Sequence, residues 1–273
     1  MTINCNGKLI DFSSPVIMGI LNVTPDSFYD GGFYVNDKEI LKQTEKMLSE
    51  GATFIDLGAY SSKPGAIYIS EEEELVRIIP IVKLLINEFP EILISIDTFR
   101  SKVAKETIEN GATLINDISA GSIDKKMFET IAKLQVPYIL MHMKGTPQNM
   151  QKNPIYNNVT TELISFFAEQ IFKLHQLQLK DIIIDVGFGF GKTIEHNYQL
   201  LRDLALFKKL DAPILVGVSR KSMLYKPLDI SPKKALNATT AANTIALLNG
   251  ANILRVHDVK EAIEAVKIVD LLN

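Results

Sequence analysis

Several features that mark protein classes are scarce or missing in this chain. Its 273 residues include one cysteine, Cys5, so no intramolecular disulfide can form and a reducing, cytoplasmic compartment is expected. The formal net charge is −3 and no long basic run is present, which argues against nucleic acid as a partner. No apolar run is long enough to span a membrane, and the first residues do not form a signal peptide. Because no linker or shift in composition divides the sequence, we expect a single domain over residues 1–273.

The sequence does contain eight short apolar runs that alternate with helical patterns. The runs cover residues 16–21, 54–55, 93–96, 114–115, 138–141, 182–184, 214–218 and 253–254. The expected helices cover about 37–49, 71–88, 101–110, 124–135, 158–178, 196–209, 233–249 and 259–272. Such runs are typical of buried parallel strands, and their alternation with helices is typical of βαβ units. The pattern predicts an α/β fold, a (β/α)8 TIM barrel, preceded by a short N-terminal β-hairpin that turns at Asn6-Gly7.

Polar residues follow the apolar runs, at the points where the strands should end. In (β/α)8 barrels the chemistry lies at the carboxyl ends of the strands, so these residues should converge on one mouth. They are Asn22, Asp56, Asp97, Asn116, Asp117, His142, Asp185, Ser219, Arg220, Lys221, Arg255 and His257. Two loops rich in turn residues, 24–32 and 61–66, follow the first two strands at this face and are candidate lids.

Asp97, Asn116 and Asp185 are the most informative of these residues. Each follows a buried strand, where an unpaired polar group would be costly. Two explanations stay open: each side chain caps the next helix or turn, or each binds a ligand. Carboxylate and amide groups that converge would suit a planar heterocycle with several N–H donors. Ser219-Arg220-Lys221, Arg255 and His257 end the last two strands, the corner where barrel phosphate sites commonly lie.

Other motifs have simpler explanations. The loop Gly187-Phe188-Gly189-Phe190-Gly191 fits neither the Walker nor the dinucleotide pattern, but its glycines would let backbone approach a flat ligand. Phe188 or Phe190 would then be an aromatic wall, or else core packing. The acidic run 71–74 is explained as a helix start, with Ser70 and Glu73 as a capping box. His142 could line the pocket, and the histidines lack the spacing of a zinc motif.

At these residues the chain resembles the dihydropteroate synthase family of folate biosynthesis. The resemblance covers nearly the whole sequence. It rests on Met18-Gly-Ile-Leu-Asn22-Val-Thr-Pro25-Asp26-Ser27-Phe28, Lys63-Pro64-Gly65-Ala66, Ser95-Ile-Asp97-Thr98, Ile115-Asn116-Asp117, Met141-His142-Met143, Asp185-Val-Gly187-Phe-Gly189-Phe190-Gly191-Lys192, Ser219-Arg220-Lys221 and Arg255-Val256-His257-Asp258. It implies a TIM-barrel transferase, a sulfonamide target, that joins (7,8-dihydropterin-6-yl)methyl diphosphate to 4-aminobenzoate, giving 7,8-dihydropteroate and diphosphate.

The resemblance also implies roles for individual residues. The pterin-binding positions are Asp97, Asn116, Asp185, Lys221 and Arg255, of which all but Asn116 are also expected to be catalytic. The diphosphate positions are Asn22, Lys63, Arg255 and His257, with the cofactor Mg2+ beside Asn22. The 4-aminobenzoate positions are Phe28, Ser62, Pro64, Phe190 and Ser219. A homodimer through the last helices is also implied, and Ala241, Ala242, Ile245 and Ala246 suggest a small-residue surface for it.

The chain departs from the family pattern in the second loop. Tyr60-Ser61-Ser62-Lys63 stands where the family usually has Glu-Ser-Thr-Arg, so Lys63 keeps the charge without the planar fork of arginine. Val186 stands in place of a common proline. Two alternatives stay open. A pterin-barrel methyltransferase would need a corrinoid partner and would lack the Ser-Arg-Lys and Arg-x-His pairing. A non-catalytic pterin-binding scaffold would have lost site residues, which are retained here.

Overall fold

The computed structural model describes residues 1–23, 37–60, 69–147, 149–150 and 154–272. Eight parallel strands close into a barrel in which each strand pairs with its neighbours in the sequence. They are β3 Val16–Asn22, β4 Phe54–Gly58, β5 Ile94–Asp97, β6 Leu114–Asp117, β7 Tyr138–Met141, β8 Ile182–Asp185, β9 Ile214–Val216 and β10 Ile253–Val256. The last strand closes the ring on the first, with Ile253 beside Val16. The predicted (β/α)8 barrel is confirmed.

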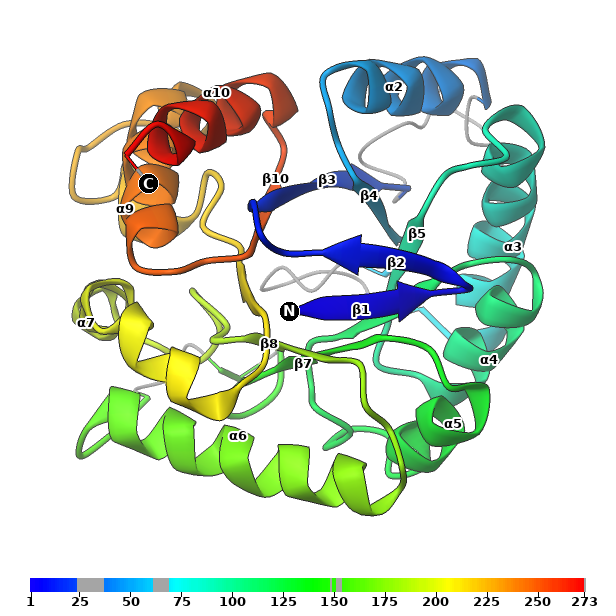
Figure 1. Cartoon of the computed structure of the whole chain (residues 1–273), viewed down its shortest axis with the longest axis horizontal. Helices are drawn as coiled ribbons and strands as arrows, with labels where there is room; N and C mark the ends of the chain where they lie inside the picture. The colour runs from blue at the N-terminus through cyan, green and yellow to red at the C-terminus, as the bar shows by residue number, and fades with distance from the viewer. Residues whose placement is uncertain (24–36, 61–68, 148, 151–153, 273) are drawn as a thin grey trace.

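Helices surround the barrel (Figure 1). They are α2 Asp37–Ser49, α3 Glu71–Glu88, α4 Ser101–Glu109, α5 Met127–Leu134, α6 Val159–Gln176, α7 Ile194–Arg202, α9 Leu236–Leu248 and α10 Val259–Asp270. The short helix α8 Ser222–Tyr225 was not predicted, and the helix expected over 233–249 consists of the 3-10 turn η2 Pro232–Lys234 followed by α9. No helix in the part of the chain that the structure describes is long and apolar enough to cross a membrane.

One predicted helix is wrong in its second half. The segment expected to be a single helix over 196–209 is α7 followed by a 3-10 helix, η1 Leu204–Leu210. The break falls at Asp203, whose carboxylate accepts hydrogen bonds from Thr160 on α6 and from Arg202. A 3-10 helix has three residues per turn, so Leu204 and Phe207 fall on the same face, and both are fully buried.

The N-terminal hairpin closes the amino end of the barrel. Strands β1 Thr2–Cys5 and β2 Lys8–Asp11 pair antiparallel around Asn6 and Gly7, both with positive φ, as the predicted turn requires. Figure 1 shows the hairpin lying across the ring of strands. Its apolar residues pack with the inward side chains at the strand starts: Ile3, Cys5, Ile10 and Phe12 against Met18, Phe54, Leu93, Leu114, Ile139, Ile183, Leu215 and Ile253. The polar mouth is therefore at the opposite, carboxyl end.

The acidic start of α3 serves the fold rather than a metal. Ser70 caps the helix, and its hydroxyl accepts a hydrogen bond from the Glu73 main-chain N–H at 3.1 Å, which is one half of the predicted capping box. The Glu73 carboxylate instead forms an ion pair with Arg77, one turn further along the helix. Glu74 does more than start a helix, because it is buried and forms an ion pair with Arg100 after β5. Among the described residues, no group of three or more His, Cys, Asp or Glu side chains could hold a metal ion.

Candidate active site

Strand alternation brings the predicted site residues together above the apolar layer. Side chains two positions apart on a strand point to the same side. Asp56, Asn116, Asp185 and Arg255 each stand two positions after an inward residue of that layer, respectively Phe54, Leu114, Ile183 and Ile253. Asp97 stands four positions after Leu93 and has the same orientation. These five polar side chains therefore enter the carboxyl end of the barrel.

Asp56 lies at the centre of this polar layer and is the residue that sequence reasoning missed. Its carboxylate is fully buried and accepts hydrogen bonds from three strands. Ser95 Oγ lies 2.5 Å from Asp56 Oδ1, while Arg255 Nε and Asn116 Nδ2 lie 2.6 Å and 3.2 Å from Oδ2. The sequence placed Asp56 after a strand, but nothing in it indicated that its partners would be an arginine and an asparagine far along the chain.

Arg255 joins two carboxylates. Its Nη2 donates to Asp97 Oδ2 at 2.8 Å, in addition to the bond from Nε to Asp56. Burial raises the pKa of Asp97, and Arg255 opposes that rise. Burial works to lower the pKa of Arg255, but Asp56 and Asp97 outweigh it and leave the pKa above its ordinary value. The guanidinium is therefore charged, and its two carboxylate partners fix its orientation at the carboxyl end of the barrel.

Asn116 and Asp117, adjacent in the sequence, have different roles. Asp117 is turned away from the mouth and accepts hydrogen bonds from Ser119, Gly121 and the Tyr138 hydroxyl, so it holds the turn after β6. Asn116 faces inward, and its Oδ1 is buried with no hydrogen-bond partner among the described residues. A buried acceptor without a donor is costly. A ligand that brings an N–H group to this point would satisfy it.

Asp185 and Lys221 flank the glycine-rich loop. The Gly187 main-chain N–H donates to Asp185 Oδ1 at 2.7 Å. Burial raises the pKa of Asp185, and Lys221 opposes the rise. Lys221 Nζ donates to the Phe188 carbonyl at 2.5 Å and lies 4.8 Å from the centre of the Phe190 ring. Burial lowers the pKa of Lys221 to about 8, against the attraction of Asp185.

The structure separates the two phenylalanines of this loop. Phe188 is fully buried in the core between barrel and helices. Phe190 is half-buried and packs against an apolar cluster at the mouth, formed by Tyr60, Ile69, Phe99, Ile118, Met141 and Met143. Phe190 is therefore the candidate aromatic wall, and Phe188 anchors the loop that carries it.

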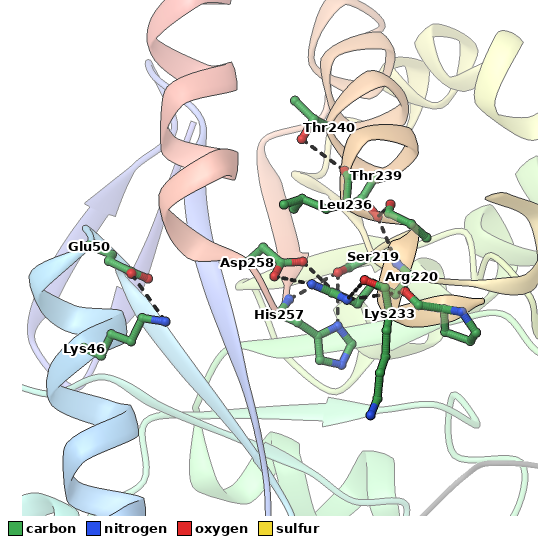
Figure 2. A network of polar contacts seen from close by, with 12 residues as sticks. Lys46, Glu50, Ser219, Arg220, Lys233, Leu236, Thr239, Thr240, His257 and Asp258 are labelled. Atoms are coloured by element: carbon green, nitrogen blue, oxygen red, sulfur yellow. Dashed lines mark hydrogen bonds and ion pairs between the residues drawn. The ribbon is translucent and has the colours of Figure 1, made fainter. Parts of the chain in front are cut away.

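Ser219 and His257 meet at the corner between β9 and β10. Ser219 Oγ lies 3.0 Å from His257 Nδ1 and accepts the His257 main-chain N–H at 3.2 Å. Figure 2 shows Arg220 reaching from this loop to Asp258, with Nε–Oδ2 and Nη2–Oδ1 distances of 2.9 Å and 2.8 Å. Arg220 has a left-handed φ of 55°. The bidentate ion pair fixes that turn, and with it the two neighbours of Arg220, Ser219 and Lys221.

Asn22 ends β3 beside Asp97. A Cβ on Gly58 would lie 3.6 Å from Asn22 Oδ1 and 3.4 Å from Asp97 Cβ, so the absence of a side chain at Gly58 leaves space between them. An amide oxygen is a suitable ligand for Mg2+, which often keeps several waters and takes its remaining ligands from substrate phosphates. Phe28, Ser62, Lys63 and Pro64 were also predicted for the site, and they lie outside the described residues.

Comparison with known proteins places the chain in a family. Residues 18–257 match the model of the family described as pterin binding enzyme. Dihydropteroate synthase of Escherichia coli strain K12 is 43% identical over 272 residues, which cover 99% of this chain and 96% of that protein. The chain belongs to the dihydropteroate synthases.

Solved dihydropteroate synthases share the whole architecture. The Yersinia pestis enzyme in complex with a sulfonamide drug has a TM-score of 0.93 and 43% identity, and the match covers 100% of this chain and 99% of that one. The Xanthomonas albilineans enzyme with 4-aminobenzoic acid has a TM-score of 0.92 and 34% identity, with 99% and 97% covered. As a dihydropteroate synthase, the chain is a transferase of folate biosynthesis that makes 7,8-dihydropteroate and diphosphate.

Proposed function

We propose that the polar layer of the barrel is where this dihydropteroate synthase binds its pterin substrate. The proposed ligands are Asp97, Asn116, Asp185, Lys221 and Arg255. The observation that carries the proposal is the buried Asn116 Oδ1, an acceptor without a donor among the described residues. The pterin ring has amino and ring N–H donors on one edge, and Asn116 with the nearby carboxylates supplies acceptors for them. Lys221 supplies a donor for the pterin carbonyl.

The leaving diphosphate belongs at the ends of β3 and β10. Asn22, Arg255 and His257 would hold it, and Lys63 would add a second cation from the loop after β4. Mg2+ fits here because Asn22 offers a neutral oxygen ligand and diphosphate would supply others. The bound ion would neutralise part of the charge on the diphosphate oxygens. Arg255 donates from a fixed position, which supports the charge that grows on the leaving group.

The amine would be 4-aminobenzoate, the molecule bound in the Xanthomonas albilineans enzyme. Its pocket would lie over Phe190, beside Ser219, with Phe28, Ser62 and Pro64 from the loops after β3 and β4. The amine nitrogen attacks the methylene of the pterin substrate, the carbon–oxygen bond to diphosphate breaks, and diphosphate leaves with the electron pair. The attacking nitrogen, now a secondary ammonium, then loses one proton and becomes the neutral secondary amine of the product. This neutral nucleophile needs positioning more than a strong base.

The partner would be a second copy of the chain, in a cytoplasmic homodimer. The predicted small-residue surface on α9 is wrong in part, because Ala242 and Ala246 are buried in the main hydrophobic core. Large apolar side chains are exposed on α9 and α10 and the residues that follow: Ile245, Leu248, Ile268, Leu271 and Leu272. An apolar face of this kind marks an interaction surface. Sedimentation of the wild type and of Ile268→Glu tests this, and a monomeric wild type would contradict it.

Calorimetric titration with a pterin tests the proposed site. We expect the wild type to bind, and Asn116→Ala to bind about tenfold more weakly or worse, because a hydrogen bond between two uncharged groups, the Asn116 amide and the pterin, is lost. A wild type that does not bind a pterin, or an Asn116→Ala variant with unchanged affinity, would contradict the proposal.

A further inference from the structure

Lys192, at the end of the glycine-rich loop, is a buried lysine with no role in the site described so far. The residue is 3% exposed. Its Nζ lies 3.0 Å from the carbonyl oxygens of Gly187 and Phe190, and 3.1 Å from both the carbonyl oxygen and Nδ1 of His142. The ammonium therefore ties the two ends of the loop to the residue that follows β7.

The loop can take this path because of its glycines. Gly187 and Gly191 have φ of +70° and +62°, in the region that side chains disfavour. A Cβ on Gly187 would lie 2.0 Å from the His142 carbonyl oxygen, and one on Gly191 would lie 2.4 Å from the Lys144 carbonyl oxygen. The loop thus lies in backbone contact with the segment after β7, and its carbonyls surround Lys192.

The same loop holds two proposed pterin ligands. The Gly187 N–H fixes Asp185, while the Phe188 carbonyl and the Phe190 ring contact Lys221. We propose that Lys192 is a positioning residue, which sets the geometry of Asp185 and Lys221 by holding the glycine-rich loop against His142. This inference rests on the proposed function, because it concerns how the same pterin site is shaped.

His142 receives a role as the acceptor for Lys192. Burial, followed by the charges of Lys192 and Lys144, lowers the pKa of His142 to about 2, so the imidazole is neutral. Acceptance at Nδ1 requires the tautomer with its hydrogen on Nε2. The ring of Phe166 meets the imidazole edge-on, with centroids 4.9 Å apart, and keeps its orientation. Burial lowers the pKa of Lys192 to about 7, and Asp185 opposes this.

Two ligands measured on one variant separate positioning from general stability. Lys192→Met keeps the length of the side chain and removes its charge and its hydrogen bonds. We expect its dissociation constant for a pterin to rise about 10- to 100-fold, the range for losing hydrogen bonds to a charged group. Diphosphate with Mg2+ should bind as in the wild type, because its proposed ligands Asn22 and His257 follow β3 and β10, and the His257 ring is held by Ser219.

A pair of substitutions at His142 tests the same contact while leaving Lys192 in place. Asn Oδ1 can take the place of His Nδ1, so we expect His142→Asn to keep pterin affinity. His142→Leu removes the acceptor and should weaken binding several-fold. This pair decides the question even if Lys192→Met does not fold. Ile131→Ala is the control for stability, because Ile131 is a fully buried apolar residue of α5 in the main hydrophobic core.

The outcomes are distinguishable. If the wild type binds no pterin, the proposed function itself is refuted. A wild type that binds, together with Lys192→Met of equal affinity, would overturn the role of Lys192 alone. Equal losses for the pterin and for diphosphate, matched by Ile131→Ala, would show that Lys192 only stabilises the fold. Equal affinities of His142→Asn and His142→Leu would also contradict the proposal.

Discussion

Asp56 and Arg255, 199 residues apart in the sequence, form an ion pair at the centre of the barrel mouth, with Arg255 Nε 2.6 Å from Asp56 Oδ2. The carboxylate is fully buried, and its other hydrogen bonds come from Ser95 and Asn116. A buried pair of this kind adds little net stability, but losing one partner leaves an uncompensated charge. We infer that Asp56 sets the direction in which the guanidinium points.

Replacing Asp56 with asparagine should therefore damage both stability and turnover. We expect the free energy of unfolding to fall by about 3 kcal/mol, the lower end for breaking a buried ion pair, because Arg255 keeps Asp97. The ratio kcat/KM should fall as well. Denaturant unfolding and steady-state kinetics measure the two effects. Glu169→Gln is the control, since its pair with Lys173 is exposed and worth less than about 1 kcal/mol. An Asp56→Asn variant as active and stable as the control would refute the role.

Replacing Asp185 with asparagine should remove most of the pterin affinity and leave the fold intact. The carboxylate is buried at the end of β8 and is tied to Gly187 by one oxygen. Loss of a charged hydrogen bond to the pterin should cost about 1.5–3 kcal/mol of binding. Calorimetry with a pterin, alongside a thermal unfolding curve, measures this. Wild-type affinity in the variant would exclude Asp185 from the site.

Arg255→Ala should reduce turnover more than His257→Ala does. Arg255 is assigned to the pterin and to the leaving group, and it also balances Asp56 and Asp97. His257 is assigned to the diphosphate alone, and its ring is held by Ser219. Steady-state kinetics of both variants under the same conditions compare them. A larger loss of kcat/KM in His257→Ala would reverse this ranking.

Pterin affinity should fall as the pH rises through about 8. Burial lowers the pKa of Lys221 to about 8, so its ammonium is charged below that value and increasingly neutral above it. The neutral amine donates a weaker hydrogen bond to a pterin carbonyl. The same shift affects stability. Between about pH 8 and pH 10.5, the ordinary pKa of the group, the unfolded chain still binds the proton that the folded protein has released, so the free energy of unfolding should rise with pH. Calorimetry from pH 6.5 to 9.5, on wild type and Lys221→Met, should show the fall centred near pH 8 only in the wild type, while any fall centred near pH 7, the pKa of Lys192, should occur in both. The same fall in both proteins would assign it to another group.

Binding of 4-aminobenzoate should depend on the other ligands. We expect weak binding to the empty enzyme and stronger binding with a pterin and Mg2+-diphosphate present, because diphosphate would attract Lys63, which is next in the sequence to the proposed pocket residues Ser62 and Pro64. Lys63→Ala should weaken this coupling, which is typically worth about 1–3 kcal/mol, while Lys63→Arg should keep it through bidentate contacts. Titrations of all three proteins with and without the other ligands measure it. Equal affinity in every condition would show a preformed pocket.

The barrel could be predicted because each of its strands has a recognisable pattern in the local sequence. A short apolar run followed by a polar residue occurs at every strand, and alternation then fixes that Asn116 points inward and Asp117 away. The helix expected over 196–209 ended early for a reason that the sequence does not show. The carboxylate of Asp203 bonds to Thr160 on another helix, so the break depends on a tertiary contact.

The interactions within the site were harder to predict because they join distant segments. Asp56 was placed at a strand end, but its role depends on Arg255, and only the closed barrel brings the two together. Lys192 was part of a recognised motif, yet the sequence does not show that its ammonium reaches His142. Phe188 and Phe190 could not be separated, because the turn at the glycines decides which ring is buried in the core.

The proposed active site is tested most directly by diphosphate release from (7,8-dihydropterin-6-yl)methyl diphosphate, measured with and without 4-aminobenzoate. We expect rapid release that requires the amine, with 7,8-dihydropteroate formed in equal amount. In the Asp185→Asn variant the same amine-dependent release should be strongly reduced. Release at the same rate without 4-aminobenzoate, or no release with both substrates present, would contradict it.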